Sequence, residues 1–226
     1  MIGIYFIALI FMLIGWAVQM QLRKKFKEYS EIPLALGLTG KEVAEKMLRA
    51  HNIVDVKVIC VEGQLTDHYN PLQKTLNLSS DVYNGNNAAA AAVAAHECGH
   101  AVQHATAYAW LQLRSSLVPV VSVTSNIVQW VLIAGILLIN IFPNLLLIGI
   151  IMFAAITFFS FITLPVEFDA SRRGLEWLET SGITNIIEHE KAKDALWWAA
   201  MTYVVAALST LATLLYYIAI FARRRN

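Results

Sequence analysis

The sequence has little cysteine and a net charge close to zero, and no internal repeat or low-complexity linker is visible. Only Cys60 and Cys98 occur, and the position of Cys98 inside a histidine-rich motif argues against a disulfide between them. Thiols that stay reduced fit a site that faces the cytosol. The formal net charge of +1 gives no indication of a nucleic-acid partner. The hydrophobic pattern is therefore the main source of information on the class of protein.

Apolar residues make up 58% of the chain, against about 45–50% in soluble domains. Four apolar runs are long enough for a bilayer span of about 20 residues: Ile2–Met20, Leu117–Ile141, Leu145–Leu164 and Leu196–Phe221. The first run lacks a basic segment before it and a small-residue cleavage site after it, which favours a retained anchor over a signal peptide. The runs contain no Asp, Glu or His, which disfavours an ion transporter. We expect a multi-pass membrane protein whose spans contact the lipid bilayer.

The segment AAAAAVAAHECGHAVQHAT places His96, Glu97 and His100 in the pattern H-E-x-x-H. Its alanine-rich start favours a helix, which Asn86 or Asn87 can cap. Two histidines four residues apart on a helix share one face, so both imidazoles can bind one zinc ion. Glu97 then lies beside the ion, as the general base for a zinc-activated water. The alternative is a pair of histidines at an accidental spacing.

A third zinc ligand is expected after the two central spans, because a membrane hairpin returns the chain to the side that it left. Pro165 suits the first turn of a new helix, and Glu167 lies in that turn. Ala170, Ser171 and Gly174 are small and lie on the same face of the helix. This helix can therefore lie close to the alanine-rich helix, which makes Glu167 the predicted third ligand.

The alternative for Glu167 is an ion pair with Arg114, Arg172 or Arg173. Asp169 lies about 200° around the helix from Glu167, so we do not expect it to bind the same ion. The oxyanion of a peptide hydrolysis needs a donor besides the metal, and four candidates stay open: His68, Tyr69, Arg172 and Arg173.

Two further donors near the motif are not expected to bind the ion. His104 follows His100 by four residues, but three histidines on a straight helix would span about 12 Å, too far for one metal. Cys98 faces away from the line that joins His96 and His100, and we interpret it as a packed thiol.

Glu31–Asn87 is the only stretch of ordinary soluble composition. The T-G-K-E segment that starts at Thr39 is a capping box for a helix. Alternating valines predict a strand over 54–60, and a turn at Asn70-Pro71 is followed by a short strand, Thr75–Leu78. If this is an edge strand beside the metal site, it can pair with an extended peptide substrate; a plain packing hairpin is the alternative.

The distribution of positive charge predicts the orientation in the membrane. Nine basic residues lie on the side of the soluble stretch: Arg23, Lys24, Lys25, Lys27, Arg114, Arg172, Arg173, Lys191 and Lys193. Three arginines at the C-terminus lie on the other side. Because cytoplasmic segments are rich in Lys and Arg, we expect the active site to face the cytosol.

Three separated segments, AAHECGHAVQH, DHYNPLQKTLNLSSDVYNGN and LPVEFDASRRGLEWLE, together resemble the neutral zinc metallopeptidases of the YugP type from bacterial membranes. The resemblance covers nearly the whole chain, and it implies zinc at His96 and His100 with Glu97 catalytic. A more distant similarity to the M48-type gluzincins implies that their glutamate ligand corresponds to Glu167. Those proteins usually carry Asp four residues later, where this chain has Ser171, so the group that orients a histidine ligand stays open.

The patterns predict a mainly α integral membrane protein, with about four transmembrane helices and a small α+β gluzincin-like metallopeptidase domain. The expected segments are an anchor at 1–22, a soluble part with the motif helix at 23–116, a transmembrane hairpin at 117–164, the glutamate helix and a following helix at 165–195, and a last span with a basic tail at 196–226. The predicted function is a zinc endopeptidase of the bacterial cell membrane that cleaves membrane or membrane-adjacent proteins. The alternative is a non-enzymatic, metal-stabilised scaffold or adaptor.

Overall fold

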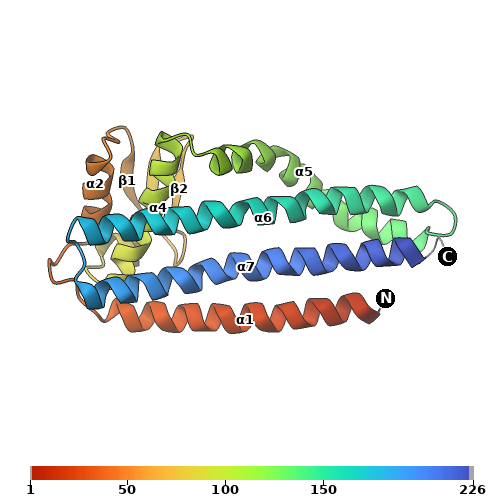
Figure 1. The fold of residues 1–226 in the computed structure, drawn as a ribbon, viewed down its shortest axis with the longest axis horizontal. Coiled ribbons are helices and arrows are strands. Elements are labelled where there is room, and N and C mark those ends of the chain that lie inside the picture. The colour runs from red at the N-terminus through yellow and green to blue at the C-terminus, as the bar shows by residue number, and fades with distance from the viewer. Residues whose placement is uncertain (1, 224–226) are drawn as a thin grey trace. The chain divides into compact units, whose positions relative to one another are not determined.

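The computed structural model describes residues 2–223 and is mainly helical (Figure 1). Four of the described helices are long and apolar enough to cross a membrane: α1 (Ile2–Ser30), α5 (Ala109–Leu137), α6 (Pro143–Thr180) and α7 (Ile186–Arg223). The other described elements are α2 (Gly40–Ala50), β1 (Lys57–Val61), β2 (His68–Asn70), β3 (Thr75–Ser79), α3 (Ser80–Asn84) and α4 (Ala88–Ala105). The predicted class, a mainly α membrane protein with a small α+β part, is confirmed.

The described chain divides into two compact units. The first unit takes in residues 2–17, 112–164 and 202–223, and the second takes in 18–111 and 165–201. The first consists of apolar helical segments with a core that includes Leu132, Leu146 and Tyr217. The second unit contains the small sheet, α2, α3, α4 and every residue predicted for the metal site.

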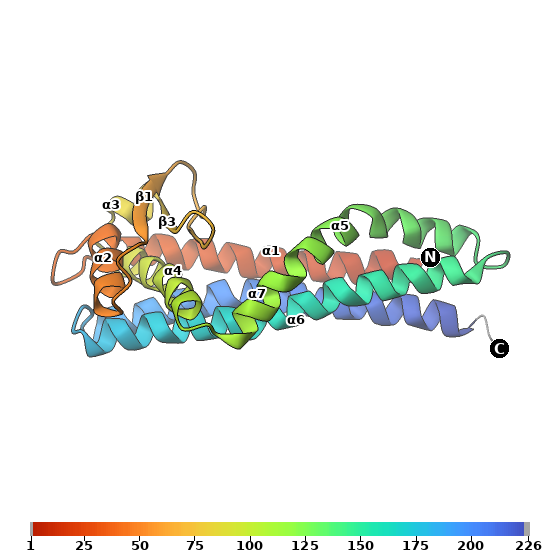
Figure 2. The same ribbon diagram turned by 90° about the horizontal axis from the view of Figure 1, so that it is seen from above.

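Helix α4 is central to the second unit, where Figure 2 shows α2, α3 and the strands close to it. All eight residues from Ala88 to Ala95 are buried. Seven of the eight are alanine, so neighbouring elements can approach α4 closely without leaving cavities. Leu76 and Leu78 of β3 and Met47 of α2 are fully buried in the same core.

Local sequence signals place the starts of two helices as expected. Thr39 caps α2, its side chain accepting from the Glu42 amide while the Glu42 carboxylate accepts from the Thr39 amide. Asn87 caps α4, and its side-chain oxygen accepts from the amide of Ala90. Both caps satisfy amides that the first helical turn leaves without a partner.

The three-stranded sheet has the order β1-β3-β2, which overturns the prediction of an edge strand at Thr75–Leu78. Strand β3 pairs in parallel with β1, Lys57 opposite Thr75, and antiparallel with β2, His68 opposite Asn77. It is central because Leu76 and Leu78 are fully buried in the core, whereas the edge strands are more exposed. The strand predicted over 54–60 begins later, at Lys57.

Two boundaries predicted at prolines are wrong. No new helix starts at Pro165, which lies inside the continuous helix α6. The ring removes only one donor, and transmembrane helices tolerate such a loss because their surroundings compensate for it. The predicted runs Leu117–Ile141 and Leu145–Leu164 leave a tight turn at Phe142-Pro143-Asn144, but the turn lies at 138–142 and Pro143 begins α6. This position suits proline because the first helical residue needs no hydrogen-bonded amide.

Candidate metal centre

The histidine pair of the motif lies within α4, where its spacing places both rings on one face. His100 and Glu97 are buried, and His96 is partly buried. The two imidazole centroids are 4.8 Å apart, with the ring planes at 81°. The pair is therefore close enough for one ion to lie between the rings.

Small residues bring α6 directly against this helix. A Cβ built on Gly174 of α6 would lie 2.8 Å from the carbonyl carbon of Ala95 in α4. Gly99, inside the motif, makes a similarly close approach to the backbone of Ala170. Because side chains do not separate the two backbones here, Glu167 can reach the histidines from α6. The predicted small-residue contact between these helices is thus present.

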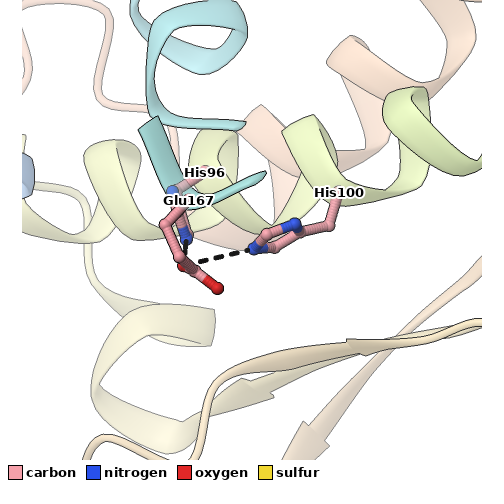
Figure 3. A group of neighbouring side chains, drawn as sticks. All are labelled: His96, His100 and Glu167. Atoms are coloured by element: carbon pink, nitrogen blue, oxygen red, sulfur yellow. Dashed lines mark ion pairs between the residues drawn. The ribbon is translucent and has the colours of Figure 1, made fainter. Parts of the chain in front are cut away.

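His96, His100 and Glu167 converge in the second unit, the two histidines from α4 and the glutamate from α6 (Figure 3). One Glu167 carboxylate oxygen lies 3.5 Å from Nε2 of His96 and 3.6 Å from Nε2 of His100. All three potential donor atoms lie within 4.8 Å of one another.

This geometry fits a tetrahedral zinc ion. Zinc bonds of about 2.0–2.2 Å place neighbouring tetrahedral ligand atoms about 3.3–3.6 Å apart. The separations of 3.5 and 3.6 Å are close to this value, and they exceed the usual length of a hydrogen bond. Two neutral imidazoles and one carboxylate are a donor set typical of catalytic zinc, which leaves a fourth position open. The residues present therefore fit the ion that the motif predicts.

The outer nitrogen of each imidazole has its own partner. Nδ1 of His96 lies 3.0 Å from the Ser171 hydroxyl, and Nδ1 of His100 lies 3.1 Å from the side-chain oxygen of Gln103. These contacts leave both Nε2 atoms facing Glu167. Gln103 was missed by the sequence analysis, although its position three residues after His100 places it on the same helix face.

The Glu97 carboxylate lies beside the histidine pair and is held by the sheet. Its Oε2 accepts a hydrogen bond of 3.0 Å from the amide of Tyr69 in β2. The strand whose backbone bonds the motif is therefore β2, at the edge of the sheet. Nothing in the residue pattern indicated this backbone contact, because it depends on the order of the strands.

The other residues singled out from the sequence have identifiable partners. Arg172 and Arg173, two of the three arginines that were weighed as partners of Glu167, both pair with Asp169. The hydroxyl of Tyr69 lies 2.9 Å from Nδ1 of His104.

His68 and Cys98 are also engaged. The His68 ring contacts the carbonyl of Thr66 and the amide of Asn77. The thiol of Cys98 is fully buried and donates to the carbonyl of Ala44, as expected for a packed thiol.

The described chain combines four helices of membrane length with an H-E-x-x-H pair that meets a carboxylate from a second helix, the kind of donor set that zinc metallopeptidases use. The chain belongs, more particularly, to the family described as "Putative neutral zinc metallopeptidase", whose sequence model matches residues 4–222. It is 40% identical over 211 residues to the "Putative membrane protease YugP" of Bacillus subtilis (strain 168), across 93% of this chain and 92% of that protein. No solved structure matches the chain.

Proposed function

We propose that the protein is a membrane-embedded, zinc-dependent endopeptidase that hydrolyses peptide bonds of membrane or membrane-adjacent proteins. His96, His100 and Glu167 are the proposed zinc ligands, and Glu97 is the proposed general base. The observation that carries this assignment is the convergence of three donor atoms from two helices within 4.8 Å, beside a buried carboxylate.

Bound zinc would supply Lewis-acid polarisation of the substrate carbonyl and would acidify a water molecule. Glu97 is placed to take up the proton of that water, because the Tyr69 amide holds one of its carboxylate oxygens and leaves the other available. The same carboxyl group can then pass the proton to the leaving amine. The burial of Glu97 limits competing contacts with solvent.

Among the four candidates for the oxyanion donor, we favour Tyr69. Arg172 and Arg173 are engaged by Asp169, and the His68 ring contacts Thr66 and Asn77. The Tyr69 hydroxyl also has a partner, Nδ1 of His104, but the backbone amide of Tyr69 bonds the proposed general base, which keeps this residue beside Glu97. Burial, followed by the nearby charge of Asp55, raises the pKa of Tyr69. Its phenol therefore stays protonated at neutral pH and can donate a hydrogen bond.

The site is proposed to face the cytosol of a bacterial cell. The nine basic residues on the side of the soluble stretch support this orientation, against three arginines at the C-terminus. Of those three, only Arg223 lies within the described residues. Protein substrates that are inserted in the membrane, or that lie beside it, would reach a site to which the apolar helix α6 contributes Glu167.

The Glu97→Gln variant tests the mechanism. It keeps the three proposed ligands, so we expect the zinc content of the purified protein to stay at the wild-type level. New N-termini on membrane proteins, mapped by proteomics in cells that carry the wild-type chain, should disappear with the variant. Glu62→Gln, at an exposed position outside the site, is the matched control and should cleave normally.

Equal cleavage by wild type and Glu97→Gln would remove Glu97 from the mechanism. Zinc binding without any difference in N-termini between the two proteins would instead support the non-enzymatic scaffold or adaptor.

A further inference from the structure

The side chain of Gln103 is completely buried between the two helices that carry the proposed ligands. Its amide nitrogen donates to the carbonyl of Val166 at 2.8 Å and to the carboxylate of Asp169 at 2.9 Å. Its oxygen faces Nδ1 of His100 at 3.1 Å. The Gln103 side chain of α4 therefore contacts a proposed ligand on its own helix. It also contacts two residues of α6, Val166 and Asp169, which lie one position before and two positions after Glu167.

The partners of Gln103 determine which way its amide points. A backbone carbonyl and an ionised carboxylate can only accept hydrogen bonds, so the NH₂ group must face Val166 and Asp169. The oxygen must then face His100, whose Nδ1 has to carry a proton in order to donate to it. In a neutral imidazole this leaves the lone pair on Nε2, the nitrogen that lies 3.6 Å from Glu167.

Asp169 is itself fixed, because Arg172 and Arg173 both pair with it. The chain of contacts runs from the arginines through Asp169 and Gln103 to His100. A carboxylate thus supports a proposed histidine ligand through an intervening amide. Ser171, at the position of the usual aspartate, contacts Nδ1 of His96, and Gln103 gives the second histidine, His100, a partner of its own.

We propose that Gln103 is a positioning residue that keeps His100 in the tautomer with the proton on Nδ1 and holds α6 in register with α4. The proposal rests on the proposed function for its use in zinc binding, but the tautomer is a property of the metal-free chain. Residues that orient metal ligands in this way typically contribute 10–100-fold to metal affinity.

The first measurement is ¹⁵N NMR of the His100 ring in the metal-free protein at alkaline pH, where the imidazole is neutral. The wild-type chain should show the Nδ1-protonated tautomer. Gln103→Met, which has a similar volume but no amide, should show a mixture of tautomers. Gln64→Met, at an exposed position outside the site, should leave the wild-type signal unchanged.

The second measurement is zinc affinity, by competition with a chelator. We expect a loss of about 10–100-fold for Gln103→Met, and no loss for Gln64→Met. Gln103→Glu keeps an acceptor for Nδ1 but turns a second carboxylate oxygen toward the Val166 carbonyl and Asp169, so it should keep the wild-type tautomer and still lose zinc affinity. Peptidase activity of Gln103→Met should return when excess zinc is added, because Gln103 touches neither substrate nor reacting atoms.

An unchanged His100 tautomer and unchanged zinc affinity in Gln103→Met would overturn the proposal and reduce Gln103 to a packing residue. If Gln103→Met prevents folding, as judged by circular dichroism in detergent, the wild-type chain decides: a proton on Nδ1 of His100 supports the acceptor role of Gln103, and a proton on Nε2 contradicts it. If Gln103→Met changes the tautomer but the wild-type chain cleaves no protein, the positioning role stands and the proposed peptidase function fails.

Discussion

Gly99 and Ala170 touch through their backbones: a Cβ built on Gly99 would lie 2.3 Å from the carbonyl oxygen of Ala170. This contact lies one residue before His100 on α4 and three residues after Glu167 on α6. The distance between the two helices, and with it the reach of the Glu167 carboxylate, therefore depends on the missing side chain of Gly99.

Gly99→Ala should force α6 away from α4, because a backbone atom cannot rotate out of the clash. Overpacking of this kind costs about 1–3 kcal/mol, and we expect zinc affinity to fall by about 5–150-fold. The measurement is chelator competition on the purified protein. Gly15→Ala is the control, since its new Cβ would meet only a Val205 methyl group at 3.9 Å. Wild-type affinity in Gly99→Ala would contradict the tight helix contact.

Glu167→Gln should remove most of the bound zinc, because it replaces the only proposed anionic ligand with a neutral amide. Zinc affinity should fall by more than about 100-fold, the upper end of the effect of residues that only orient metal ligands. The metal content is measured by mass spectrometry after dialysis. Glu176→Gln, on the same helix but exposed, should retain zinc fully. Full zinc occupancy in Glu167→Gln would point to a different third ligand.

The titration of His100 in the metal-free protein reports on the same carboxylate. Burial lowers the pKa of His100, but the nearby Glu167 carboxylate more than offsets this, so the pKa lies above its ordinary value. Protons should therefore compete with zinc from a higher pH than for a free histidine, and zinc affinity should fall as the pH drops through this pKa. In Glu167→Gln, NMR should show a lower pKa, since burial then dominates. An equal His100 pKa in the wild-type chain and in Glu167→Gln would contradict the contact between His100 and Glu167.

Tyr69→Phe should lower kcat by about 100-fold if the phenol donates to the oxyanion, with little change in KM or zinc content. The reason is that the hydrogen bond would form mainly in the transition state. Steady-state kinetics on a peptide substrate, identified from the proteomic comparison, provide the measurement. Tyr83→Phe, a half-buried tyrosine of α3, is the matched control. A wild-type kcat in Tyr69→Phe would return the choice of donor to the remaining candidates.

Thiol labelling can report the orientation of the second unit without added cysteines. Cys60 is exposed on β1, whereas Cys98 is fully buried, and burial followed by the charge of Glu97 raises the pKa of Cys98 far above its ordinary value. A membrane-impermeant maleimide should therefore label only Cys60, and only after the cells are opened. Cys60→Ser should abolish the labelling. Labelling of intact cells would reverse the proposed orientation.

Much of this protein follows from local sequence patterns. The four spans follow from the length of their apolar runs, because bilayer thickness sets the number of residues needed. The caps at Thr39 and Asn87 follow from side chains that reach the amides of the next turn. The position of His96 and His100 on one face of α4 follows from helix geometry alone, because they are four residues apart. Such features depend on residues close in sequence, so no knowledge of the tertiary fold was needed.

Only the tertiary structure decided the features that join distant segments. The hydropathy pattern could not indicate that α6 passes through Pro165 without a break, since that depends on what surrounds the helix. The order of the strands made β2 the edge that reaches Glu97, although β3 has the more strand-like sequence. Asp169 and His100 are 69 positions apart, and only the packing of α6 on α4 allows Gln103 to connect them. The sequence by itself determined which groups are able to bind a metal, and long-range packing determined how those groups are oriented.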